Sequence, residues 1–113
     1  MAQNRNQLIQ LFVGNIYNAI VHSILEKAID KEEIKEKYDK ELKSSFAKAE
    51  IYRAKINPIN NAFPTNDAEE LRKIIINRVN RELKNRELRG YKNIDFSLVE
   101  ILVEDYFKKL NIV

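Results

Sequence analysis

Residues 8–29 read LIQLFVGNIYNAIVHSILEKAI, and their apolar positions recur at the three- and four-residue spacing of an α-helix. Two apolar stripes run along this helix instead of one: Ile9, Phe12, Ile16, Ile20 and Ile24 form the first, and Gly14, Tyr17, Val21, Leu25 and Ala28 form the second. A helix that is apolar on two sides must be covered on two sides. It is therefore either the central helix of a bundle or half of an interface between two copies of the chain.

The interface alternative has its own candidate residues, which are Gly14, Tyr17, Val21 and Leu25. Gly14 lacks a Cβ, so a second helix could approach closely beside the larger side chains. In that case the chain is a homo-oligomer, most simply a dimer.

The residues that follow predict a break in the helix. Residues 30–34 read DKEEI, in which Asp30 can accept from the first backbone N–H groups of a new helix and Glu33 can complete a capping box. This pattern predicts a hairpin, with a second helix over residues 31–56. The alternative is one uninterrupted helix over residues 4–56, because the apolar stripes stay in phase across the break.

Two more helices are predicted over residues 68–89 and 98–110, after a loop over residues 57–66. Asp67 and Ser97 are the expected N-caps, since each has a Glu three residues later. Gly90 is expected to end the third helix in a left-handed conformation, and Ile59 and Phe63 are expected to anchor the loop. The predicted fold is all-α, a single domain over residues 1–113 that forms a four-helix antiparallel bundle with a long N-terminal helical hairpin.

Composition excludes several functional classes. The chain has 113 residues, no Cys and one His, so a disulfide scaffold, a thiolate metal site and a multi-histidine metal centre are ruled out. We found no phosphate-binding glycine loop and no catalytic motif, and we expect no enzyme activity, metal or cofactor.

The single histidine, His22, is expected to form a surface pair with Glu26, four residues on. Polar residues interrupt the apolar stretch, so we expect no membrane span and a cytoplasmic location.

The distinctive chemical feature is a basic segment. Residues 72–92 contain eight Lys or Arg and two Glu, a net charge of +6, while the whole chain carries +3. One helix face is predicted to hold Lys73, Asn77, Asn80, Arg81 and Lys84, extended by Arg78, Arg86, Arg89 and Lys92. Lys and Arg neutralise phosphates, and Asn and Arg can pair with base edges. Tyr91 is a candidate for stacking on a base.

Two functional hypotheses remain open. The first is a non-enzymatic, self-associating binding or assembly protein that contacts DNA or RNA through the basic helix face. The second is a protein–protein adaptor or a subunit of a larger complex, with no nucleic-acid contact. Residues 94–113 carry a net charge of −2, and an acidic last helix could dock on the basic helix and occupy its face.

Overall fold

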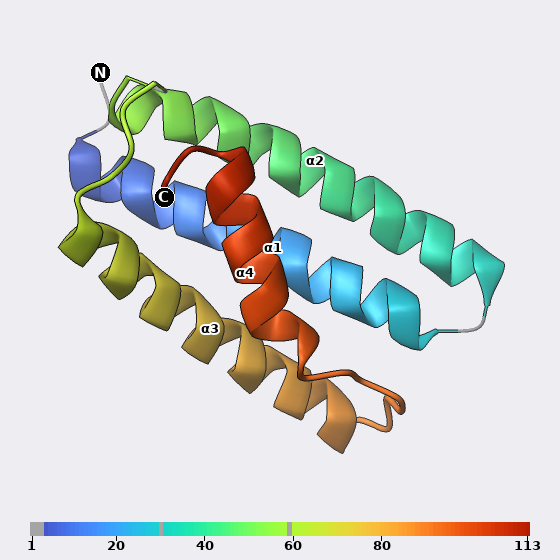
Figure 1. Ribbon diagram of the computed structural model, residues 1–113. Coiled ribbons are helices and arrows are strands. Elements are labelled where there is room, and N and C mark those ends of the chain that lie inside the picture. Colours follow the sequence, from blue (N-terminus) through green and yellow to red (C-terminus); the bar gives the residue numbers. More distant parts are fainter. Residues whose placement is uncertain (1–3, 30, 59) are drawn as a thin grey trace.

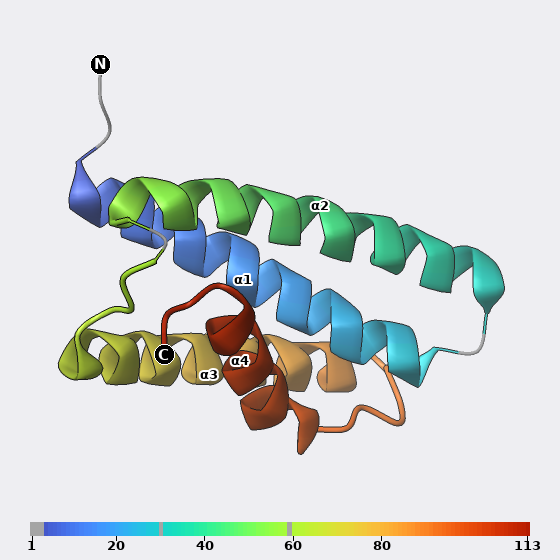
Figure 2. The same ribbon diagram turned by 45° about the horizontal axis from the view of Figure 1, so that its top comes forward.

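The computed structural model describes residues 4–29, 31–58 and 60–113 of the protein, and these residues form four helices and no strand (Figure 1). Helix α1 covers Arg5–Ala28, α2 covers Glu32–Ile56, α3 covers Thr65–Leu88 and α4 covers Leu98–Lys109. The all-α prediction is confirmed, as is the long first hairpin. In Figures 1 and 2, α4 crosses the other helices at a steep angle instead of continuing the antiparallel arrangement.

The chain breaks between α1 and α2, so the alternative of one continuous helix is wrong. Ile29 and Lys31 both have extended backbones, with φ/ψ of −109°/137° and −79°/117°. Lys31 is the N-cap residue of α2, and its side chain makes no capping hydrogen bond. The predicted capping role of Asp30 falls outside the described residues.

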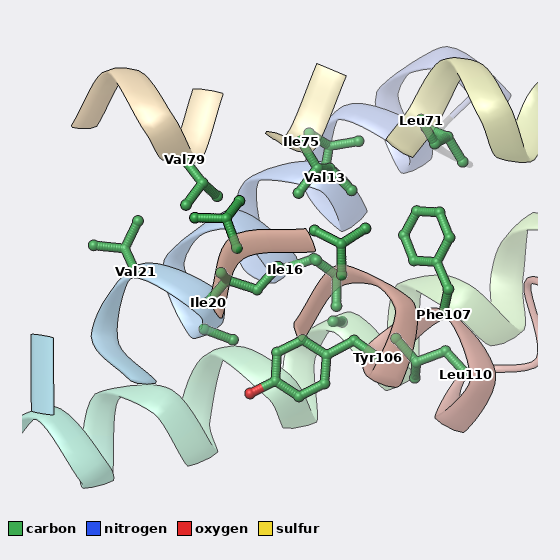
Figure 3. Close-up of a cluster of buried hydrophobic side chains, with 14 of the residues drawn as sticks. Val13, Ile16, Ile20, Val21, Leu71, Ile75, Val79, Tyr106, Phe107 and Leu110 are labelled. Atoms are coloured by element: carbon green, nitrogen blue, oxygen red, sulfur yellow. The ribbon is translucent and has the colours of Figure 1, made fainter. Parts of the chain in front are cut away.

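Helix α1 lies at the centre of the bundle and packs against each of the other three helices. Figure 3 shows side chains of α1 meeting those of α3 and α4, and all of the residues it labels are buried: Val13, Ile16, Ile20, Val21, Leu71, Ile75, Val79, Tyr106, Phe107 and Leu110. Burial of both apolar stripes within one chain satisfies the requirement for cover on two sides. Helix α1 is also long and apolar enough to cross a membrane by length and composition, but half of its most apolar window is buried in this bundle.

The predicted interface between copies is corrected by this packing. Val21 is 3% exposed and Leu25 is 0% exposed within a single chain, so neither side chain is available to a second copy. Gly14 and Tyr17 are half-buried, and the guanidinium of Arg78 lies 4.3 Å from the centre of the Tyr17 ring. A Cβ added at Gly14 would meet Arg78 Nη1 at 3.9 Å. Gly14 therefore faces a flexible side chain and does not serve close helix approach.

Helix α3 begins three residues earlier than predicted and ends where expected. Its N-cap position is Pro64, and Asp67 lies in the first turn, where its carboxylate pairs with Arg5 at 3.5 Å instead of capping the helix. Proline has a φ that is already suited to a helix start. At the other end Gly90 has φ 103°, and the N–H of Tyr91 donates to the carbonyl of Arg86, which is the geometry of a Schellman motif.

The start of α4 does not follow the predicted pattern either. Ser97 has a helical backbone, with φ −67° and ψ −17°, and makes no capping hydrogen bond. Instead, its N–H and hydroxyl both donate to Oδ1 of Asp95, which orders the turn before the helix. At the C-terminal end the N–H of Ile112 donates to the carbonyl of Phe107 over 2.8 Å, and Ile112 is fully buried. Leu110 and Ile112 are thus part of the core, whereas Val113 is 45% exposed.

Arg53 is a charged residue of the core that the sequence analysis did not single out. It is 0% exposed, and its guanidinium lies 4.6 Å from the centre of the Phe63 ring. Its hydrogen bonds within the described residues go to uncharged oxygens: the carbonyls of Asn57, Asn61, Leu110 and Asn111 and the side-chain oxygen of Asn57. Burial lowers the pKa of this guanidinium from its ordinary value. Arg53 thereby joins the end of α2, the following loop and the end of α4.

Candidate nucleic-acid interface

Helix α3 carries three basic side chains, Lys73, Arg81 and Lys84, on the side that faces away from the bundle. Leu71, Ile75, Val79 and Leu83 bury the inner side of this helix. The opposite side carries an outer basic face, which we define as the exposed residues Lys73, Asn77, Arg81 and Lys84. Their spacing of four, four and three residues places them along one line of the helix. Because α3 lies at an edge of the bundle in Figure 2, this line is open to solvent.

The outer basic face is not neutralised by ion pairs within the described part of the chain. The ion pairs of α3 there join Asp67 to Arg5, Arg72 to Glu104, and Arg86 to Glu82. None of them involves Lys73, Arg81 or Lys84. The basic residues of α3 therefore differ in their partners: Arg72 and Arg86 are paired with carboxylates and Arg78 lies over the Tyr17 ring, whereas Lys73, Arg81 and Lys84 point outward and are in no ion pair among the described residues.

The acidic last helix does not occupy this face. Helix α4 packs against the inner side of α3, where Val103 and Phe107 are fully buried. Its contact with the basic residues is the pair between Glu104 and Arg72, whose guanidinium also lies 5.7 Å from the centre of the Phe107 ring. Docking of α4 within the chain thus involves Arg72 and leaves the outer basic face exposed.

The remaining candidate residues are spread over other positions. Asn80 is half-buried at the border of the outer basic face. Arg78 is exposed but leans over the Tyr17 ring. Arg89 and Lys92 are exposed at the end of α3 and in the turn beyond it. Arg86 is half-buried and bonded to Glu82 at 2.8 Å, so it does not extend the face as predicted.

Arg86 belongs instead to a polar cluster formed by residues of α1, α2, α3 and the turn after α3. We define this polar cluster as His22, Tyr38, Glu41, Glu82, Arg86 and Tyr91. The Tyr38 and Tyr91 hydroxyls are 2.9 Å apart, and Nη1 of Arg86 donates to the Tyr91 hydroxyl over 3.4 Å. The hydrogen bond from Arg86 lowers the pKa of Glu82, and burial together with the hydrogen bond to Tyr91 raises the pKa of Tyr38.

These contacts correct two expectations from the sequence. The partner of His22 is Glu41 on α2, with Nε2 and Oε2 3.0 Å apart, and not Glu26. Tyr91 is not free to stack on a base, since its hydroxyl is bonded to Tyr38 and Arg86 lies 5.6 Å from the centre of its ring. Neither partnership is visible in the sequence, because both join residues on different helices or turns.

His22 lies inside the hairpin formed by α1 and α2. Its ring stacks on Tyr38 with centroids 5.4 Å apart, and its Nδ1 is buried with no hydrogen-bond partner among the residues that the structure describes. Burial lowers the pKa of His22, with a smaller lowering by Arg86, although Glu41 acts in the opposite direction. A neutral imidazole that donates from Nε2 to a carboxylate fits this environment. Protonation would place an unpaired N–H in the interior.

Metal chemistry has no support in the part of the chain that the structure describes. No group of three or more His, Asp or Glu side chains there is arranged to hold an ion.

Comparisons of this chain with protein-family models, with curated proteins and with solved structures find no match. Functional inference therefore depends on the chemistry of the surface itself.

Proposed function

We propose that the protein is a non-enzymatic binding protein that contacts nucleic acid through the outer basic face of α3. The observation that supports this proposal is the difference between two sets of basic residues on one helix. Arg72 and Arg86 are paired with carboxylates of the same chain, whereas Lys73, Arg81 and Lys84 are exposed and unpaired in the described structure. A polyanion can supply the missing negative charge, and each phosphate neutralised releases counterions.

The charge of α2 makes a useful comparison. Helix α2 is also rich in Lys, but its acidic residues are interleaved with them: Glu32, Glu33, Glu36, Asp39, Glu41 and Glu50. One of its lysines, Lys43, is bonded to Asp39 at 2.8 Å. Mixed charge gives little net attraction for a phosphate backbone. The net +6 over residues 72–92 makes α3 the stronger candidate.

The test is a charge reversal with a matched control. The double variant Lys73→Glu/Arg81→Glu reverses two of the three positive charges of the outer basic face. The control Lys37→Glu/Lys40→Glu reverses two positive charges at exposed positions of α2. Binding to labelled nucleic acid at low salt is expected to be lost in the first variant and retained in the second, with both still helical by circular dichroism. Equal binding by the two variants would show that α3 is not the contact surface.

A second candidate function is supported by apolar residues beside the outer basic face. Ile74 is 45% exposed and Leu88 is 86% exposed, and an acidic protein partner could use both the charges and these side chains. If the protein is such an adaptor, Leu88→Ser is expected to weaken its complex with the acidic protein partner, and that complex is expected to persist at higher salt because apolar contacts contribute to it. Val21 and Ile112 are buried in the core and are not available to such a partner.

A further inference from the structure

We infer that the nucleic acid suited to the outer basic face is duplex DNA, with α3 lying in the major groove. This inference rests on the proposed function and specifies its ligand. Three features of the described structure point to it: the aromatic side chains near α3 already have partners, the helix lies at an edge of the bundle, and its polar residues are ordered along one line.

The first feature disfavours single-stranded ligands. Proteins that bind single strands stack bases on exposed aromatic rings. Near α3, Arg78 covers the Tyr17 ring at 4.3 Å, and Tyr91 is bonded to Tyr38 and covered by Arg86. The exposed large apolar residues of α3 are aliphatic, Ile74 and Leu88. The surface thus offers charge without a stacking platform.

The second feature is shape. Helix α3 has 24 residues, a length of about 36 Å, and Lys73 to Lys84 span about 16 Å along its axis. The major groove of B-form DNA is about 12 Å wide and admits an α-helix. The major groove of A-form RNA is too narrow and deep for side chains to read. An edge helix with a charged outer line therefore fits duplex DNA better than duplex RNA.

The third feature is the order of the polar groups. Asn77 lies one turn from Lys73 and one turn from Arg81 on the outer line. An Asn amide can pair with adenine, and Arg or Lys can pair with guanine, at the floor of the major groove. Arg89 is exposed and turned roughly 120° away from Asn77 around the helix, where a cation would meet a phosphate strand at the groove wall.

Acidic residues at the start of α3 limit where the duplex can lie. Glu70 is exposed on the same side as Asn77, two turns earlier, and Glu69 is exposed beside it. Asp67 is paired with Arg5, but Glu69 and Glu70 are in no ion pair among the described residues. Their charge repels phosphates and favours the stretch from Lys73 to Lys92, where the exposed Lys and Arg side chains outnumber the exposed carboxylate of Glu87. Removing the charge of Glu70 should therefore tighten binding.

The experiment compares four ligands of one base composition by fluorescence anisotropy: duplex DNA of about 16 base pairs, roughly one and a half turns, duplex RNA, and a single strand of each. Duplex DNA is expected to bind about tenfold more tightly than the others at the same salt. Glu70→Gln should raise duplex affinity roughly threefold, and the matched α2 change Glu50→Gln should leave it unchanged. Polyglutamate at equal charge should not displace the duplex.

The outcomes separate the ligand from the function. Equal or tighter binding of a single strand or of duplex RNA overturns the duplex-DNA inference but leaves nucleic-acid binding in place. Displacement of the duplex by polyglutamate overturns the inference in favour of an acidic protein partner. An unchanged affinity in Glu70→Gln overturns the placement of the duplex on the second half of α3. No binding of any of the four ligands at low salt overturns both the inference and the proposed function.

Discussion

The Nε of Arg53 donates a hydrogen bond to the carbonyl of Leu110 over 2.7 Å, which ties the end of α2 to the end of α4 across 57 residues of sequence. The other nitrogen atoms of the guanidinium bond to oxygens of the loop after α2 and of the C-terminal turn. Among the described residues this buried cation has no carboxylate partner, and it is tolerated because five oxygen acceptors surround the guanidinium.

Replacement of Arg53 should therefore be costly. Arg53→Met keeps the bulk but leaves buried carbonyl oxygens without donors, and we expect the free energy of unfolding to fall by about 3 kcal/mol. The control, Lys48→Met, changes an exposed residue of the same helix and should alter it by no more than about 0.5 kcal/mol. Urea unfolding followed by circular dichroism gives both values, and equal stability of the two variants would contradict the role of Arg53.

The pH dependence of stability should reveal His22, the single histidine of the chain. Because burial lowers the pKa of folded His22, the unfolded chain takes up a proton first as the pH decreases. The free energy of unfolding should be fully retained above about pH 6.5, the ordinary histidine value, and decline as the pH falls below it. Urea unfolding at several pH values between about 7 and 5.5, on both sides of the ordinary histidine pKa, measures how the free energy of unfolding changes with pH.

Two further results would check this assignment. His22→Gln should flatten the slope in the same pH range, and the single imidazole signal in a proton NMR titration should move at a pH below 6.5. An imidazole that titrates above that value would show that Glu41 outweighs burial.

Two glycines should respond in opposite directions to the same substitution. Gly14→Ala adds a Cβ in ordinary contact with Arg78, and it should raise the free energy of unfolding by about 0.5–1 kcal/mol through helix propensity. Gly90→Ala forces a side chain into φ 103° and should lower it by about 1 kcal/mol. Thermal unfolding compares them, and a destabilised Gly14→Ala variant would indicate a close packing role at that position.

The core position of Val21 predicts how an aspartate there should behave. Val21→Asp buries a charge next to the α3 side chains shown in Figure 3, and we expect loss of the folded state by circular dichroism. Asn18→Asp, at an exposed position of α1, should remain folded. The parent chain should sediment as a monomer at micromolar concentrations. A folded Val21→Asp variant that only changes oligomeric state would restore the interface assignment of α1.

The positions of the helices could be predicted from the sequence better than the contacts between them. The spacing of Ile16, Ile20 and Ile24 predicted α1, and a glycine at residue 90 marked the end of α3. These are local signals, carried by neighbours one turn apart. The start of α3 differs from the prediction because the capping-box pattern at Asp67 lies inside the first turn, and the helix begins directly after Pro64, whose φ of −52° suits a helix start.

The contacts between helices could not be predicted in the same way. Periodicity places His22 on a polar strip but does not say that Glu41 of α2 will face it. The two apolar sides of α1 fitted a core helix and an interface equally well, and the answer depended on where α3 and α4 pack. Arg53 did leave a signal, since it lies four residues after Ala49 and three before Ile56, at the spacing of the apolar stripe of α2. The outer basic face was predicted in part, with Arg86 as the residue that turned inward.

Contact of α3 with nucleic acid through Lys73, Asn77, Arg81 and Lys84 can be tested residue by residue. We would titrate the ¹⁵N-labelled protein with unlabelled duplex DNA at low salt, where electrostatic contacts are strongest, and follow the NMR signals. The backbone amide signals of these four residues and of Arg89 and Lys92 are expected to shift, and those of Lys37 and Lys40 on α2 are expected to stay in place. Shifts confined to α2, or no shifts at all, would contradict this contact.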